Sequence, residues 1–233
     1  MSSASSSEAP QRPEALPASE ARAKGEMLLK ACQELRAEDA LQLVSEGADV
    51  DFADEFGETP LMRASIEGLE AVAARLVEAG AALDLVGLGG NSALMFASSN
   101  GHTAVVQLLA DRGAALDLVD KEGMSALMWA SLQGHAAVAQ LLADRGAKLD
   151  LVDEDGCSAL IVACSGGHAA AAQLLAARMD AAALNLVDST GKTALDHANE
   201  GGEDKGKVAE LEPAAAAIRA RGGLTGAEIA ARA

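Results

Sequence analysis

The sequence predicts an all-α solenoid of about six stacked helix-turn-helix units, including caps, with turn or hairpin loops projecting from the stack. Two observations carry the prediction: a 33-residue period in turn glycines and the same period in apolar residues. A third, the 2% aromatic content beside 50% hydrophobic residues, indicates a core of Ala, Leu, Val and Met that lets helices approach closely. The repeating columns are Gly57, Gly90, Gly123 and Gly156; Gly68, Gly101, Gly134 and Gly167; Gly47, Gly80, Gly113 and Gly146; Leu61, Leu94, Leu127 and Leu160; Ala64, Ala97, Ala130 and Ala163.

Residues 120–152 show how the period becomes local structure. Ser125 is a suitable N-cap for a first helix, and Gly134 separates that helix from a second one. The second helix carries apolar residues at i, i+3 and i+4 within 138–142, and Gly146 stands where it ends. One such helix pair cannot bury its apolar stripe alone, so identical neighbours must stack on it.

The opening of the second unit, Asp54-Glu-Phe-Gly-Glu-Thr-Pro-Leu-Met-Arg-Ala-Ser65, resembles the ankyrin repeat almost letter for letter. The following Gly-His, Leu-Leu and Gly-Ala pairs recur at the same spacing. The resemblance covers roughly residues 26 to 211, most of the chain. It implies the ankyrin solenoid and a protein-binding role.

The domain organisation follows from these patterns. Residues 1–22 are rich in Ser, Ala, Pro and Glu and are expected to form a disordered leader. Residues 222–233 form a short tail that can be helical, because Thr225 and Glu228 have the capping-box spacing. The repeat domain between them, 23–221, divides into a capping unit 23–53, full units 54–86, 87–119, 120–152 and 153–187, and a terminal unit with a capping helix, 188–221.

Two units depart from the pattern. In the fifth, Met179 occupies the helix-ending glycine position and two extra residues precede Gly191, which predicts an irregular helix end and loop. In the third, Gly87-Leu-Gly-Gly90 replaces Asp-x-x-Gly, so the acidic turn residue is missing.

Charge and composition limit the function classes. Asp and Glu outnumber Lys and Arg by 35 to 18, giving a net charge of −17, which disfavours nucleic-acid and anionic-membrane partners. A basic or amphipathic protein segment is a better partner, although acidity also serves solubility. With no signal pattern, no long apolar run and three cysteines without a CxxC pair, we expect a monomer in the cytoplasm, with the nucleus as the alternative location.

No catalytic, cofactor or metal signal stands out. His102, His135 and His168 recur every 33 residues. The resemblance to ankyrin repeats implies stacked units about 10 Å apart, which is too far for them to share a zinc ion with bonds of roughly 2 Å. Each histidine is expected to bond locally to the backbone. Cys157 and Cys164 lack further ligands and are expected to be inert thiols. We therefore predict a protein that is not an enzyme and that binds no cofactor or metal.

Met62, Met95 and Met128, with Phe96 and Trp129 beside them, form a column on the first helices. A ligand groove is conceivable, but in the resembling family this column packs between repeats, so the sequence favours a core role for it.

The resemblance also implies where a partner binds: the turn residues and the pair before the inter-helix glycine, on the concave face. The predicted partner-binding residues are Glu55, Phe56, Glu58, Ile66, Glu67, Leu88, Asn91, Ser99, Asn100, Lys121, Glu122, Met124, Leu132, Gln133, Glu154, Asp155 and Cys157. Among them Phe56, Ile66, Met124 and Leu132 are the expected apolar anchors. The alternative is a non-catalytic adaptor or inhibitor subunit of a larger complex, such as a ubiquitin-ligase or kinase assembly.

Overall fold

The computed structural model describes residues 16–201 and 207–232, and in these ranges the regular structure is helical. The helices are α1 Ala18–Gln33, α2 Ala37–Ser45, α3 Pro60–Ile66, α4 Glu70–Glu78, α5 Ala93–Ser99, α6 Thr103–Asp111, α7 Ala126–Leu132, α8 Ala136–Asp144, α9 Ala159–Ser165, α10 Ala169–Ala176, α11 Ala181–Leu184, α12 Ala194–Glu200, α13 Val208–Ala220 and α14 Gly226–Ala230.

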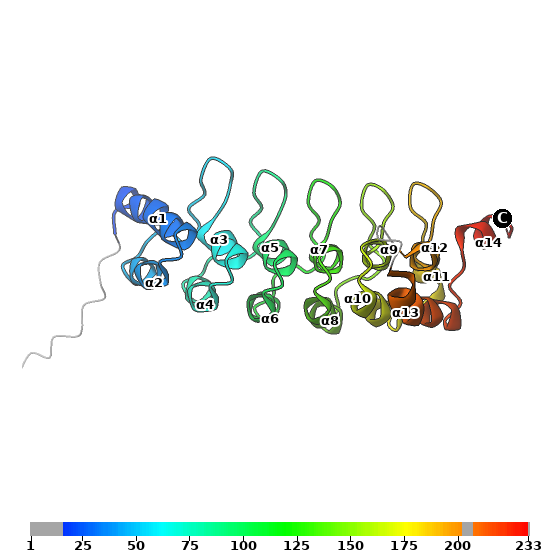
Figure 1. Cartoon of the computed structure of the whole chain (residues 1–233). Coiled ribbons are helices and arrows are strands. Elements are labelled where there is room, and N and C mark those ends of the chain that lie inside the picture. The colour runs from blue at the N-terminus through cyan, green and yellow to red at the C-terminus, as the bar shows by residue number, and fades with distance from the viewer. Residues whose placement is uncertain (1–15, 202–206, 233) are drawn as a thin grey trace, which may run out of the picture.

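The helices form two rows, and a hairpin loop projects on the same side from each unit that begins with a turn (Figure 1). One row, the inner helices, runs α1, α3, α5, α7, α9 and α12; the other, the outer helices, runs α2, α4, α6, α8, α10 and α13. Each helix packs on its partner and on the next helix of its own row. The predicted all-α solenoid is confirmed.

Side-chain caps begin the inner helices α3, α5, α7, α9 and α12. The hydroxyl oxygens of Thr59, Ser92, Ser125, Ser158 and Thr193 each accept a hydrogen bond from the backbone N–H three residues later. Each cap satisfies one of the backbone donors that a helix start leaves without an intrahelical acceptor. The outer helices α4, α6, α8 and α10 begin without such a side-chain bond.

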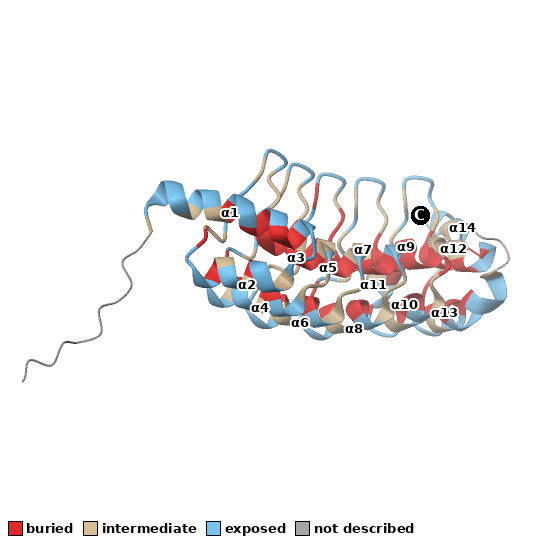
Figure 2. Cartoon of the chain, turned by 60° about the vertical axis from the view of Figure 1, so that its left-hand side comes forward, coloured by how far each residue is buried: buried red, intermediate tan, exposed pale blue. Residues whose placement is uncertain are grey.

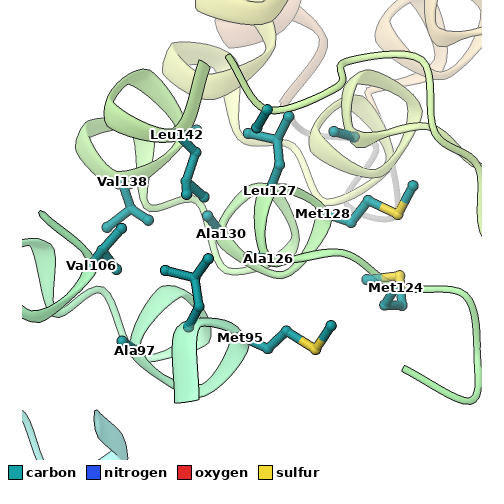
Figure 3. Close-up of a cluster of buried hydrophobic side chains, with 14 of the residues drawn as sticks. Met95, Ala97, Val106, Met124, Ala126, Leu127, Met128, Ala130, Val138 and Leu142 are labelled. Carbon is teal, nitrogen blue, oxygen red and sulfur yellow. The ribbon is translucent and has the colours of Figure 1, made fainter. Parts of the chain in front are cut away.

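The core is a continuous band between the two helix rows (Figure 2). Met62, Met95 and Met128 are each 1% exposed, so their predicted core role is confirmed. Figure 3 shows Met95 and Met128. Phe96 and Trp129 follow Met95 and Met128 directly, and both are only half-buried. Successive helical positions differ by about 100° in direction, so the residue after a core methionine lies at the edge of the core. Phe96 and Trp129 pack against the core without being enclosed by it, so the expected core role is confirmed only in part for these two aromatics.

The N-terminal unit begins earlier than the sequence indicated. Residues 1–15 of the expected disordered leader lie outside the described residues, but residues 18–22 are the first turn of α1, so the expectation is wrong there. The Ala21 carbonyl accepts a hydrogen bond from Asp49 N–H at 2.8 Å. The Arg22 guanidinium lies 5.4 Å from the centre of the Phe52 ring. These contacts with the loop after α2 extend the helix toward the N-terminus.

The last units are irregular in the way that Met179 predicted. Met179 is 2% exposed, and Asp180 caps the additional helix α11 by accepting from Ala183 N–H at 2.9 Å. The C-terminal segment then returns to this place: Leu224 N–H donates to Asn185 Oδ1 at 2.7 Å, and Thr193 Oγ1 donates to the Leu224 carbonyl at 2.8 Å. Residues 222–226 therefore cover the end of the array.

In the described part of the chain, no helix combines the length and apolar character needed to cross a bilayer.

Candidate binding surface

The hairpin turns are held by aspartate side chains. Asp120 Oδ1 accepts hydrogen bonds from the backbone N–H groups of Glu122 at 3.1 Å and Met124 at 2.9 Å. Asp54, Asp153 and Asp188 make the equivalent pair of bonds in their own units. These bonds fix the turn backbone, and with it the directions in which the side chains at the turn leave it.

Neighbouring hairpins are joined tip to tip through the backbone. The N–H groups of Leu88, Lys121, Glu154 and Ser189 donate to carbonyls of the preceding hairpin at 2.9, 3.1, 3.1 and 2.7 Å. The accepting carbonyls belong to Phe56, Gly89, Glu122 and Asp155. Most of these residues are turn members of the predicted partner-binding set, so the structure places the turn members along one connected row.

The histidines connect successive units at the other end of the inner helices. Nε2–H of His102, His135 and His168 donates to the carbonyls of Ile66, Ser99 and Leu132, at 2.9, 3.1 and 2.8 Å. The expectation of a local backbone bond is wrong, because each acceptor lies 36 residues earlier, in the preceding unit. Across the described residues, no three His, Cys, Asp or Glu side chains gather as a metal-binding group.

Most predicted partner-binding residues are open to solvent. Exposed members are Glu55, Phe56, Glu67, Leu88, Asn100, Lys121, Glu122, Leu132, Gln133, Glu154 and Asp155. Half-buried members are Glu58, Ile66, Asn91, Ser99 and Cys157. The apolar side chains among the exposed members are Phe56 at 56%, Leu88 at 63% and Leu132 at 38%.

Met124 is the exception, because it is only 8% exposed. Its backbone N–H is bonded to Asp120, and its side chain belongs to the same buried cluster as Met95 and Met128 (Figure 3). The prediction that Met124 is an apolar anchor for a partner is therefore wrong.

The predicted partner-binding set leaves out a column on the inner helices, in which the sequence analysis noted only Phe96 and Trp129. The column consists of Arg63, Phe96, Trp129, Val162 and His197. Trp129 Nε1–H donates to Asp120 Oδ2 at 2.9 Å, and His197 Nε2 lies 2.8 Å from Asp188 Oδ2. Arg63 forms an ion pair with Glu58. The column therefore reaches the hairpin turns, and its variation from unit to unit was the available signal.

A second missed column is apolar. Val86, Val119, Val152 and Val187 stand where the hairpins begin, each bridged to an N-cap residue, and are 41–49% exposed. Three of them share the 33-residue spacing and the fourth follows the two-residue insertion, which was a detectable signal.

A hollow of about 290 Å³ lies where the hairpins of the second and third units meet Phe96. Phe56, Leu88 and Phe96 supply its apolar lining; the other lining residues are Glu58, Gly87, Gly89 and Asn91. The next unit carries Asp120 and Glu122 where this one has Gly87 and Gly89, so the wall of the hollow lacks two side chains that the equivalent positions carry one unit later. We call it the Phe56–Phe96 hollow.

The cysteines have no activated thiolate. Burial raises the pKa of Cys32 and of Cys164 to about 12. The pKa of Cys157 is also raised to about 12, first by burial and then by the carboxylates of Asp153, Asp188 and Asp155. A thiol with such a pKa stays protonated at neutral pH and is a poor nucleophile.

These features define a linear repeat protein, in which each unit packs on its neighbours and presents variable side chains from a constant framework. A family model described as "Ankyrin repeats (3 copies)" matches residues 28–120, 75–153 and 127–207, so the chain belongs to the ankyrin repeat family. Ankyrin repeats are generally protein–protein interaction modules, and proteins built from them are typically non-catalytic. A search of curated proteins finds no match to the chain.

Proposed function

We propose that the chain captures a partner protein along the row of hairpin tips and the inner helices behind them, as far as the helix ends at Ile66 and Leu132. We call this surface the hairpin strip. The single observation that carries the proposal is the tip-to-tip row of hydrogen bonds, from Leu88 to Ser189, that holds the variable turn residues in one line. A surface already ordered before binding loses less conformational entropy when a partner arrives.

The side chains of the strip support a binding role. Phe56 and Leu88 are large, apolar and more than half exposed, and large apolar side chains are common anchors at protein interfaces. Ile66 and Leu132 add apolar surface at the far ends of their helices, and their carbonyls are already bonded to histidines. A partner would therefore meet apolar side chains without having to satisfy those backbone acceptors.

The test is capture from cell lysate by immobilised full-length chain, with mass spectrometry of what is retained. The double variant Ile66→Asp/Leu132→Asp should lose the proteins that wild type retains specifically, because two buried carboxylates in an interface are costly. The matched control is Met27→Asp/Val208→Asp, which changes two exposed apolar residues on α1 and α13. Retained capture by the strip variant, with circular dichroism showing both variants folded, contradicts this placement.

A further inference from the structure

We propose that the hairpin strip is divided, and that its partner is a basic segment carrying one large apolar side chain: the apolar side chain enters the Phe56–Phe96 hollow while lysines or arginines contact the hairpins of the fourth and fifth units. The inference rests on the proposed function and names the chemistry of the partner.

The hollow fits a side chain better than a small molecule. At about 290 Å³ it is at the lower limit of roughly 300–1,000 Å³ that ligand pockets occupy. Phe56 and Leu88 leave 56% and 63% of their surface in water, which is unfavourable until a partner covers them. Because glycines form part of the wall, the backbone itself limits how large an entering group can be.

The other end of the strip is acidic. Glu122, Glu154 and Asp155 are exposed at neighbouring hairpin tips, and in the described residues none of the three is in an ion pair. Lys121 is the single basic residue among the exposed predicted tip positions. Burial is the main cause of the raised pKa of Cys157, and the nearby carboxylates of Asp153, Asp188 and Asp155 raise it further, as a negative field at the hairpin of the fifth unit does. Such a field favours a cationic partner over a neutral one.

The two ends have a defined separation. The hollow lies between the second and third units, and the acidic tips belong to the fourth and fifth units. Packed helices lie about 8–10 Å apart, so two repeat spacings place the centre of the acidic tips roughly 20 Å from the hollow. An extended chain covers about 3.3 Å per residue, so about six residues should separate the apolar side chain from the basic cluster. The spacing makes the inference more specific than charge attraction alone.

The experiment selects dodecapeptides from a random phage-displayed library on the immobilised full-length chain and discards those that also bind the bare support. The selected peptides should share a large apolar residue about six positions from two or more lysines or arginines. One selected peptide is then labelled with fluorescein, and its affinity is measured by fluorescence polarisation against matched variants.

Phe56→Ser/Leu88→Ser should lower the affinity for this peptide by about tenfold or more. Met27→Ser/Val208→Ser should leave the affinity unchanged. Glu122→Gln/Glu154→Gln/Asp155→Asn should lower the affinity for the peptide and make that affinity less dependent on salt concentration. The control with the same change in charge is Glu38→Gln/Glu70→Gln/Glu210→Gln, on exposed positions of α2, α4 and α13. Melting temperatures verify that each variant is folded.

The outcomes separate this inference from the proposed function. Peptides that need the strip but lack the apolar residue, the basic cluster or their spacing overturn the divided strip and leave partner capture intact. Enrichment of acidic peptides, or of none, also overturns the divided strip. Failure of the proposed function is read separately, from lysate capture that survives Ile66→Asp/Leu132→Asp.

Discussion

The indole N–H of Trp129 donates a hydrogen bond to Asp120 Oδ2 at 2.9 Å, while the other oxygen of the same carboxylate holds the hairpin turn. An inner helix is thereby tied to the loop that begins its own unit. His197 and Asp188 repeat the arrangement in the terminal unit. The relationship matters for function, because it links the framework of the solenoid to the orientation of the turn residues.

Trp129→Phe should lower the free energy of unfolding by about 1–2 kcal/mol, because it keeps most of the ring packing and removes a hydrogen bond to a charged group. Trp129→Ala should cost about 3 kcal/mol, since packing is lost as well. Urea denaturation followed by circular dichroism measures both. Phe96→Tyr serves as a control, because it changes another half-buried aromatic ring without removing a hydrogen bond. An unchanged midpoint for Trp129→Phe would mean that the bond to Asp120 adds no stability.

Gly87→Asp should stabilise the protein by about 1 kcal/mol relative to Gly87→Ala, because the new carboxylate can accept the turn N–H groups that Asp120 accepts one unit later. Gly87 is outside the left-handed region, and a Cβ there would lie 3.3 Å from the Phe56 carbonyl oxygen, which requires only a small shift. Both variants remove the same glycine flexibility, so the difference between their melting temperatures measures the contribution of the carboxylate. Equal melting temperatures would contradict the prediction.

Gly101→Ala and Gly113→Ala differ in one respect that can be measured. Both glycines have positive φ, +74° and +86°, so alanine is strained at either position by about 1–2 kcal/mol. A Cβ at Gly113 meets nothing within 4 Å, whereas one at Gly101 would lie 2.7 Å from the His135 ring. Gly101→Ala should therefore be the more destabilising, because it also disturbs the bond from His135 to the Ser99 carbonyl.

The two glycine variants can be compared by chemical denaturation at one pH. A Gly101→Ala loss no greater than that of Gly113→Ala would show that the histidine contact between units adds nothing to stability.

The pKa of Asp188 is lowered to about 2. Burial alone would raise it, but hydrogen bonds from the Thr190 hydroxyl, His197 and the turn N–H groups outweigh burial. A depressed folded-state pKa gives stability that is present above the unfolded value of about 3.9 and is lost as pH falls toward 2. The loss should not exceed about 2 kcal/mol.

Asp188→Asn should reduce the loss in the free energy of unfolding that wild type shows as pH falls toward 2. Urea unfolding of wild type and variant at pH 5 and pH 2.5 gives the comparison, in which the other carboxylates titrate alike in both proteins. If the difference between wild type and variant is the same at the two pH values, the linkage to Asp188 is absent.

Much of the fold follows from local sequence. The cap at Ser125, the helix end at Gly146 and the irregularity at Met179 depend on residues a few positions apart, so the sequence carries them directly. The 33-residue period also requires neighbouring units to be equivalent, and stacking is how equivalent helix pairs bury their apolar stripes.

The candidate site was only partly predictable, because it depends on contacts between residues far apart in the sequence. Met124 was expected to contact a partner but is buried, and Trp129 was expected in the core but is only half-buried. Both are placed by the packing of a whole hairpin on a helix rather than by residue type alone. The histidine bonds join residues 36 positions apart, and the contact of Leu224 with Asn185 joins residues 39 apart.

The sequence by itself determined that the chain is a row of equivalent helix pairs, with caps, breaks and turn glycines at stated positions. Only the tertiary structure decided which side chains the row buries, where α1 begins and where the Phe56–Phe96 hollow opens. The physical reason is range: caps and turns are set by bonds within a few residues, whereas burial at a repeat interface depends on atoms contributed by the neighbouring unit.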